Sequence, residues 1–348
     1  MAGAIHRRCA IVGSVRSLIA LGLVVSFVTP AEPCATAPPE GKEAEIAEEE
    51  AVIVWDAAKH VEHFIRKASF HTNAASFGFL VPTPTTPELG EVGDEVFGQL
   101  LREIRPDVRV EKSGFEPSCM LMMGGAKSAG GAGPTEVSVI QTARVAGFDA
   151  TTLAATDPAA LGDWLGKHGF VSTPALTAWL DRYVTDHWKV TAFVVAADRD
   201  GDIATRSVRM TFSTDRPFYP YREPAQRATT TDRLLRVFVL ASQRFEATLA
   251  DKPWVAEPFY AGPIAAPSEL VTLAGEHPFA TVFADKSSPR LGIDEVYFRP
   301  SADQTVLHQP DIIEHRLHQF PLEAIPLTLI VLIVWRSIAR RRRRPRAT

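Results

Sequence analysis

The chain has 348 residues, of which 46% are hydrophobic and 22% charged, a composition typical of globular rather than disordered proteins. The formal net charge is −4, but residues 1–32 carry about +2 and the residues from Arg336 onward about +7, which leaves about −13 for the rest. An acidic body argues against a nucleic-acid partner, because proteins that bind nucleic acid need a basic face to replace phosphate counterions.

Residues 1–31 have the pattern of a secretory signal peptide. Arg7 and Arg8 precede an uncharged apolar core at residues 18–28, which is shorter than the ~20 residues of a membrane span. We therefore predict export, with cleavage after Ala31. Cleavage after Ala37 fits the small-residue rule but lies far from the apolar core, and an uncleaved N-terminal anchor is the alternative. Residues 32–50, rich in Ala, Pro and Glu, predict an exposed lead-in.

Residues 52–55 predict a first strand, and period-two spacing of apolar residues predicts two more within residues 64–89. In this second stretch two sets of residues at period-two spacing predict one buried sheet face: Phe64, Ala68, Phe70, and then Phe77, Phe79, Val81. The small, polar residues 71–76 between the sets predict a hairpin connection. The prolines that follow, Pro82, Pro84 and Pro87, lack backbone donors, so we expect this segment to leave the sheet as an extended arm.

The middle of the chain combines helices and strands. Helical spacing of apolar residues predicts a helix at residues 91–104. Residues 119–134, rich in Gly and Ala, predict a flexible linker rather than a phosphate-binding loop, because no G-x-x-x-x-G-K-[ST] pattern is present. A strand at 137–148 and helices beginning at Asp157-Pro158 and Thr173-Pro174 follow. We expect residues 188–197 and 206–213 to form a hairpin, with further strands at 234–241, 280–283 and 295–298.

Several of these segments resemble one family. They are AVIVWD at residues 51–56, the stretch at residues 64–89, VSVIQTARVAGFDATTL from Val137, DPAALGDWLGKHGF from Asp157 and VRMTFSTDRPFYPYR from Val208. In this order they resemble an extracytoplasmic bacterial family, domain-of-unknown-function family 2330, over roughly residues 34–298. The resemblance implies no activity, substrate or catalytic residue, because the family has none to carry over.

We predict an α+β fold with mainly antiparallel sheets and a few amphipathic helices, because strand pairs outnumber strong helices. The expected order after the lead-in is a first subdomain at residues 51–118, the linker at 119–134 and a second subdomain at 135–300. A juxtamembrane segment at 301–320, a transmembrane helix at 321–339 and an Arg-rich cytoplasmic tail at 340–348 complete the chain.

No catalytic motif, cofactor site or metal site is predicted. His60 and His63 lack the H-E-x-x-H spacing of zinc proteases, and His315 and His318 fit a solvated juxtamembrane helix better than a metal site. Two hypotheses stay open. The first is an extracytoplasmic domain that binds or scaffolds an unknown protein or ligand, and the second is an enzyme whose site assembles from distant residues.

The sequence contains three cysteines, and Cys9 lies in the predicted signal peptide. Exported thiols meet an oxidising compartment, so Cys34 and Cys119 are predicted to form a disulfide bond.

The C-terminal residues predict a membrane anchor. The uncharged run at residues 324–335 is about a dozen residues long, and its neighbours extend it to roughly 17–20 residues. Trp335 suits the membrane interface, Arg336 can snorkel, and Arg340 and Arg341 begin a cluster that stays in the cytoplasm. This predicts a single-pass protein of the bacterial cell membrane that contacts lipid through this helix and has its body outside. The alternative is a C-terminal sorting signal that is cleaved off.

Overall fold

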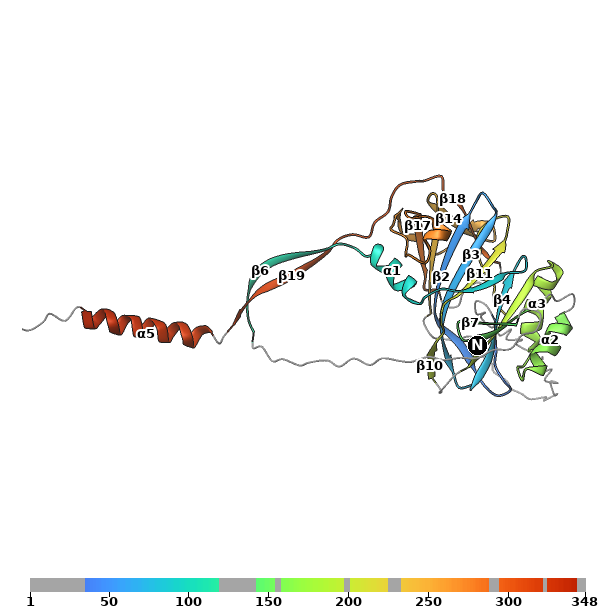
Figure 1. Ribbon diagram of the computed structural model, residues 1–348, viewed down its shortest axis with the longest axis horizontal. Helices are drawn as coiled ribbons and strands as arrows, with labels where there is room; N and C mark the ends of the chain where they lie inside the picture. Colours follow the sequence, from blue (N-terminus) through green and yellow to red (C-terminus); the bar gives the residue numbers. More distant parts are fainter. Residues whose placement is uncertain are drawn as a thin grey trace, which may run out of the picture.

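Two β-sheets packed face to face make up most of the body (Figure 1). The computed structural model describes residues 35–118, 142–153, 158–196, 201–224, 233–287, 294–321 and 324–342. The larger sheet has eight strands. Seven strands follow one another in the order β16 (Pro258–Pro263), β17 (Phe279–Asp285), β13 (Leu234–Ala241), β2 (Ala44–Asp56), β3 (Val61–Thr72), β11 (Val208–Ser213) and β5 (Glu88–Glu91). The eighth strand, β10 (Gly201–Ala204), pairs with the end of β3 that β11 leaves free.

The second sheet has five strands in the order β1 (Ala35–Ala37), β4 (Ser76–Thr83), β9 (Lys189–Ala196), β8 (Phe148–Leu153) and β7 (Thr142–Val145). Every pair in it is antiparallel. In the larger sheet the pair β13–β2 is parallel and the others are antiparallel. The predicted α+β class with mainly antiparallel sheets is confirmed at this level.

The main hydrophobic core fills the space between the two sheets. Phe70 on β3 meets two rings of β4, with centroid distances of 4.9 Å to Phe77 and 5.4 Å to Phe79. All six residues that alternation placed on a buried face are at most 3% exposed. A small four-stranded sheet closes one end of this core, with the order β12 (Phe218–Tyr219), β18 (Val296–Pro300), β14 (Phe245–Leu249) and β15 (Lys252–Pro253).

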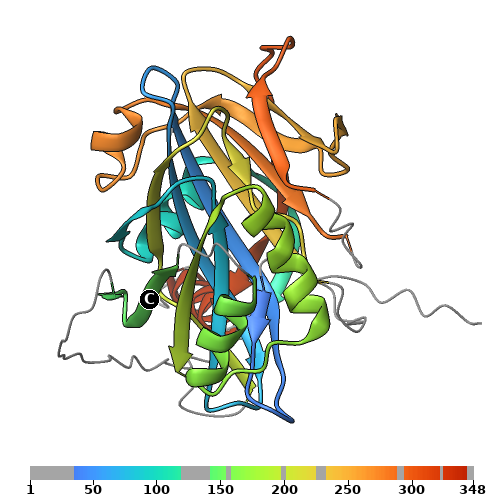
Figure 2. The same ribbon diagram turned by 90° about the vertical axis from the view of Figure 1, so that its right-hand side faces the viewer.

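Helices cover the outer face of each sheet, so the body has four layers (Figure 2). Helices α1 (Glu95–Glu103) and α4 (Val271–Ala274) lie on the larger sheet, where Phe97 and Leu100 pack against Val52 and Phe238. Helices α2 (Pro158–Lys167) and α3 (Pro174–Thr185) lie on the five-stranded sheet. Helix α3 begins as predicted, since the Thr173 hydroxyl accepts the N–H of Leu176 at 3.1 Å and Pro174 follows the cap.

Strand pairing differs from prediction in two places. No hairpin forms across residues 71–76, because β3 and β4 belong to different sheets and the chain crosses the core between them. The predicted hairpin of residues 188–213 is also wrong: β9 pairs with β4 and β8, whereas β11 pairs with β3 and β5. In both places neighbours in sequence face each other across the core instead of sharing a sheet.

Three local predictions also need correction. Residues 35–50 are not an exposed lead-in, because β1 and the start of β2 bury Ala35 and Ile46. Pro82 stays in β4 opposite Val190. The described residues of β1 pair with β4 only as far as Leu80, so no described strand pairs with the proline on its other side. The described part of the strand predicted at 137–148 is a β7–β8 hairpin, which turns at residues 146–147 with positive φ angles.

Strands from the two predicted subdomain ranges share both large sheets. Strands β2 and β3 pair with β13 and β11, and β4 pairs with β9. One continuous core therefore contains residues from both ranges. The linker predicted at 119–134 lies outside the described residues, as do the signal peptide and the end of the tail.

A long extension leaves the body toward the C-terminus (Figure 1). Strand β6 (Val108–Ser118) and strand β19 (Ile312–Pro321) form a parallel two-stranded ribbon, and helix α5 (Ala324–Arg342) follows. The helix expected around His315 and His318 is therefore wrong, because pairing with β6 holds these residues in a strand. Among the described helices, none is long and apolar enough to meet the criterion for a membrane span.

Candidate functional site

Helix α5 exposes its apolar side chains in every direction. Seven consecutive residues, Leu329 to Trp335, are 51–68% exposed. Seven residues make about two turns, so apolar side chains surround the helix instead of forming one stripe. A helix in water normally buries its apolar side chains, whereas no described residue covers these.

The predicted anchor residues lie on this helix. Trp335 is 68% exposed, and Arg336 follows it on the exposed surface. The backbone of Arg340 and Arg341 continues the helix through its last turn. Cys34 and Cys119 lie outside the described residues, so their disulfide stays a prediction.

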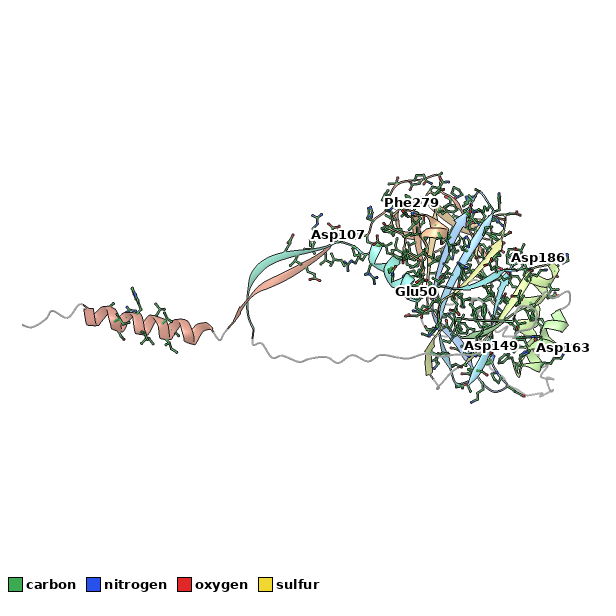
Figure 3. The ribbon with its side chains drawn as sticks, viewed as in Figure 1. Glu50, Asp107, Asp149, Asp163, Asp186 and Phe279 are labelled. Atoms are coloured by element: carbon green, nitrogen blue, oxygen red, sulfur yellow. The ribbon has the colours of Figure 1, made fainter. Side chains whose placement is uncertain are left out.

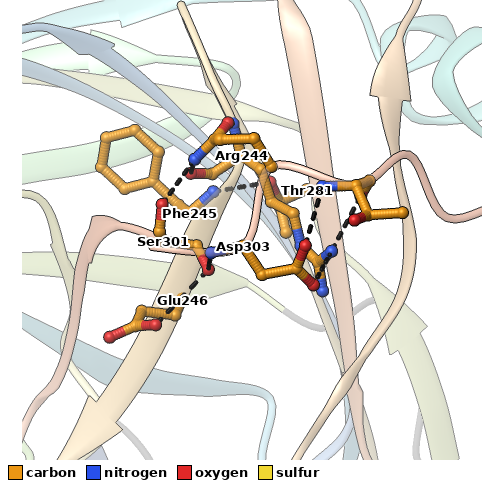
Figure 4. A network of polar contacts seen from close by, with 8 residues as sticks. Arg244, Phe245, Glu246, Thr281, Ser301 and Asp303 are labelled. Carbon is orange, nitrogen blue, oxygen red and sulfur yellow. Dashed lines mark hydrogen bonds and ion pairs between the residues drawn. The ribbon is translucent and has the colours of Figure 1, made fainter.

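A polar network fixes the start of the C-terminal extension to the body (Figure 4). The Arg244 guanidinium donates from Nη1 to Asp303 Oδ2 and to the Thr305 carbonyl, each at 2.8 Å. The Ser301 N–H donates to the Arg244 carbonyl at 2.9 Å, and the N–H of Phe245 donates to the Thr281 hydroxyl at 3.0 Å. Residues 301–305 are thus held against β14.

Further contacts hold the chain up to the ribbon. Gln309 donates its side-chain amide to the Ile104 carbonyl at 3.1 Å. The N–H of Ile312 donates to the Asp107 carbonyl at 2.8 Å, where the ribbon leaves the body (Figure 3). Beside it Arg109 Nε lies 2.7 Å from Asp311 Oδ2. These contacts and the β6–β19 ladder make a structured stalk between the body and helix α5.

A narrow pocket opens between the two large sheets. Its walls are mostly aromatic and aliphatic, and its two cations are Arg66, buried on β3, and Arg206, exposed at the rim. Arg66 is ion-paired with the buried Glu49 and lies 3.9 Å above the Phe79 ring. The pocket leaves about 30 Å³ for the centre of a water-sized sphere, enough for about two water molecules.

An acidic recess of about 410 Å³ adjoins this pocket and shares Arg206 with it. Its carboxylates mainly hold backbone groups in place. Asp94 Oδ1 accepts the Ser207 N–H at 2.7 Å, and Glu269 Oε2 accepts the Gly93 N–H at 2.7 Å. Within the described ranges no three His, Cys, Asp or Glu side chains are placed to hold a metal ion.

Comparison with known proteins identifies the family. A family model described as "uncharacterized protein conserved in bacteria", domain-of-unknown-function family 2330, matches residues 30–291. The chain belongs to this family. A search of curated proteins found no match. The matched range covers most of the body and strand β6 of the stalk, and it ends before β18, β19 and helix α5.

Two carboxyl groups with raised pKa, Glu62 and Glu295, are fully buried in this family member. Burial raises the pKa of the Glu62 carboxyl well above its usual range, although the N–H of Phe218 donates to it at 2.9 Å. Burial also raises the pKa of Glu295, whose carboxylate accepts the Tyr183 hydroxyl at 2.7 Å. Neither residue lines the pocket or the recess.

The histidines weighed in the sequence have structural surroundings. His60 lies in the β2–β3 turn with a positive φ of 52°, and its ring meets Trp55 edge-on. His63 Nδ1 lies 2.9 Å from the Thr211 hydroxyl. Burial, followed by the nearby Arg209, lowers the pKa of His63. The two histidines are therefore part of the hairpin's packing.

Proposed function

We propose that this protein is a membrane-tethered extracytoplasmic protein whose body binds or scaffolds another molecule. The observation that carries the proposal is the exposed apolar surface of α5 at the end of the stalk, away from the body (Figure 1). Transfer of apolar surface out of water is worth about 25 cal/mol per Å², so a lipid environment would stabilise this helix.

The arginines that follow the apolar run support one orientation of the helix in the membrane. Arg336, Arg340 and Arg341 follow it directly, and such clusters stay in the cytoplasm under the positive-inside rule. The predicted signal peptide would export everything before the helix. The body, stalk and pockets then lie outside, and the arginines hold the end of the chain inside.

The apolar run of α5 is shorter than the hydrocarbon core of a bilayer. About a dozen uncharged residues span roughly 18 Å at 1.5 Å per residue, less than the ~30 Å hydrocarbon core. Snorkelling of Arg336 and local thinning of the bilayer would make up part of the difference. Trp335 would lie at the cytoplasmic interface.

The binding half of the proposal is supported by the body's surface. The acidic recess and the apolar pocket meet at Arg206, so a ligand or protein there would contact apolar, acidic and basic groups within one surface. Cavities that combine apolar walls with a few polar groups are where proteins usually bind partners.

Truncation tests the tether. A chain ending at Pro321 lacks α5, and we expect it in the soluble extracytoplasmic fraction, whereas the full chain sediments with membranes and resists alkaline carbonate. A chain that lacks only residues 343–348 is the matched control and should stay with membranes. Full-length protein that washes off with carbonate would contradict the proposal. Mature protein that has lost its C-terminus and is soluble would support the cleaved sorting signal.

A further inference from the structure

Arg233, just before β13, is a buried cation with unused hydrogen-bond donors. Its side chain is 5% exposed, and its ionic contact runs from Nη1 to Glu223 Oε1 at 3.6 Å. This separation is longer than a normal hydrogen bond. Within the part of the chain that the structure describes, Arg233 Nε and Nη2 have no hydrogen-bond partner.

These two nitrogens form one edge of the guanidinium. Nε–H and the neighbouring Nη2–H point the same way, and together they bind the two oxygens of a carboxylate or phosphate in parallel. Leaving buried donors unsatisfied is costly, more so for a charged group, and such groups in native proteins call for an explanation such as a bound ion or water. The free edge of Arg233 therefore has the geometry of an oxyanion receptor.

Unlike Arg233, the charged residues Arg222 and Asp285 have hydrogen-bond partners at normal distances. Arg222 Nη2 donates to Asp294 at 2.9 Å. Asp285 accepts the Tyr221 hydroxyl at 2.9 Å and the Ser287 N–H at 2.8 Å.

A second buried donor belongs to Trp254, which packs on Tyr221. Trp254 is 4% exposed, and its Nε1 has no hydrogen-bond partner among the described residues. The Trp254 ring meets the ring of Tyr221 edge-on at 5.7 Å, and Tyr221 precedes Glu223 by two residues. Among the described residues, Arg233 and Trp254 thus each hold buried donors that have no hydrogen-bond acceptor.

We propose that the Nε–Nη2 edge of Arg233 binds a small oxyanion, a carboxylate, phosphate or sulfate group. Glu223 holds the opposite side of the guanidinium and so directs the free edge toward the ligand. Because Glu223 already offsets part of the positive charge, the affinity is modest and depends on the two parallel hydrogen bonds more than on net charge. The site is independent of helix α5 and of the membrane tether.

Calorimetric titration of the full chain in detergent with phosphate, and separately with acetate, tests the proposal at constant ionic strength. Arg233→Lys keeps the charge but removes the paired donors, and we expect a roughly tenfold to hundredfold loss of affinity, as for charged hydrogen bonds worth about 1.5–3 kcal/mol. Arg182→Gln is the matched control at an exposed arginine on α3, away from the pocket and the recess, and should bind as the parent does.

Equal affinity in the parent and in Arg233→Lys would mean an adventitious ion only, and absence of binding heat in the parent would equally overturn the site. If Arg233→Lys fails to fold, crystals of the parent soaked in selenate decide the question. A selenium peak within hydrogen-bond distance of Nε and Nη2 supports the site, and its absence refutes it.

Discussion

The charged residues inside the sandwich are the main difference between the sequence pattern and the structure at the residue scale. Period-two spacing correctly places Phe64 and Phe70 on the inner face of β3, and Glu62 and Arg66 have the same parity. Both are buried, yet the pattern alone does not separate a buried charge from a break in the alternation. The position of Arg66 in the same alternating set as Phe64 and Phe70 could have indicated that it is buried. Its partner Glu49 could not have been found in this way, because it lies in a segment predicted to be an exposed lead-in.

Glu62 makes stability depend on pH. Burial raises its folded-state pKa above the unfolded value, so its contribution is fully present below the unfolded pKa and is lost as pH rises through the folded pKa. Glu62→Gln cannot ionise but still accepts the Phe218 N–H. We therefore expect the variant to be more stable than the parent at pH 8, and the difference to shrink toward pH 4.

Urea unfolding between pH 4 and pH 9 measures this difference. While Glu62 alone differs in protonation between the folded and unfolded states, the parent should lose about 1.4 kcal/mol per pH unit relative to the variant. Glu246→Gln is the control, because Glu246 lies near the surface in an ion pair with Arg299. Parallel pH profiles of the parent and Glu62→Gln would show that Glu62 does not titrate in this way.

At the scale of elements, the sequence located the strands and helices better than it paired them. Residues 234–241 and helix α3 with its Thr173 cap follow from local patterns, and the structure confirms them. Pairing depends on contacts between distant segments, so β3 and β4 were expected to share a hairpin although they lie in opposite sheets. The stalk was missed for the same reason, since its two strands are almost 200 residues apart in sequence.

The predicted Cys34–Cys119 disulfide belongs to this scale because it would join the ends of two elements. Ala35 begins β1 in the body, whereas Ser118 ends β6 opposite Pro321 at the α5 end of the stalk, so these neighbours of the two cysteines lie apart and the bond stays an expectation from the sequence alone. The bond would add on the order of 4 kcal/mol by loop closure, less any strain. Exported protein should show no free thiols before reduction and two after it. Two reactive thiols without reduction would exclude the bond.

At the scale of the whole molecule, an acidic body is joined through a fixed stalk to an apolar helix and an arginine tail. The acidic surface would be repelled by anionic lipids, and the ribbon places the body away from the helix (Figure 1). Composition and charge order predicted the acidic body, the apolar run and the arginine tail. The stalk, the pocket and the recess arise from segments that only the fold brings together.

The membrane topology is the central claim, and a tag after Thr348 tests it most directly. In intact spheroplasts, external protease should degrade the body and leave the tag on a short protected fragment, which becomes sensitive only after lysis. An antibody to the body serves as the control for protease access. Removal of the tag without lysis would contradict the topology, and its absence from an otherwise intact mature protein would replace the anchor with a cleaved sorting signal.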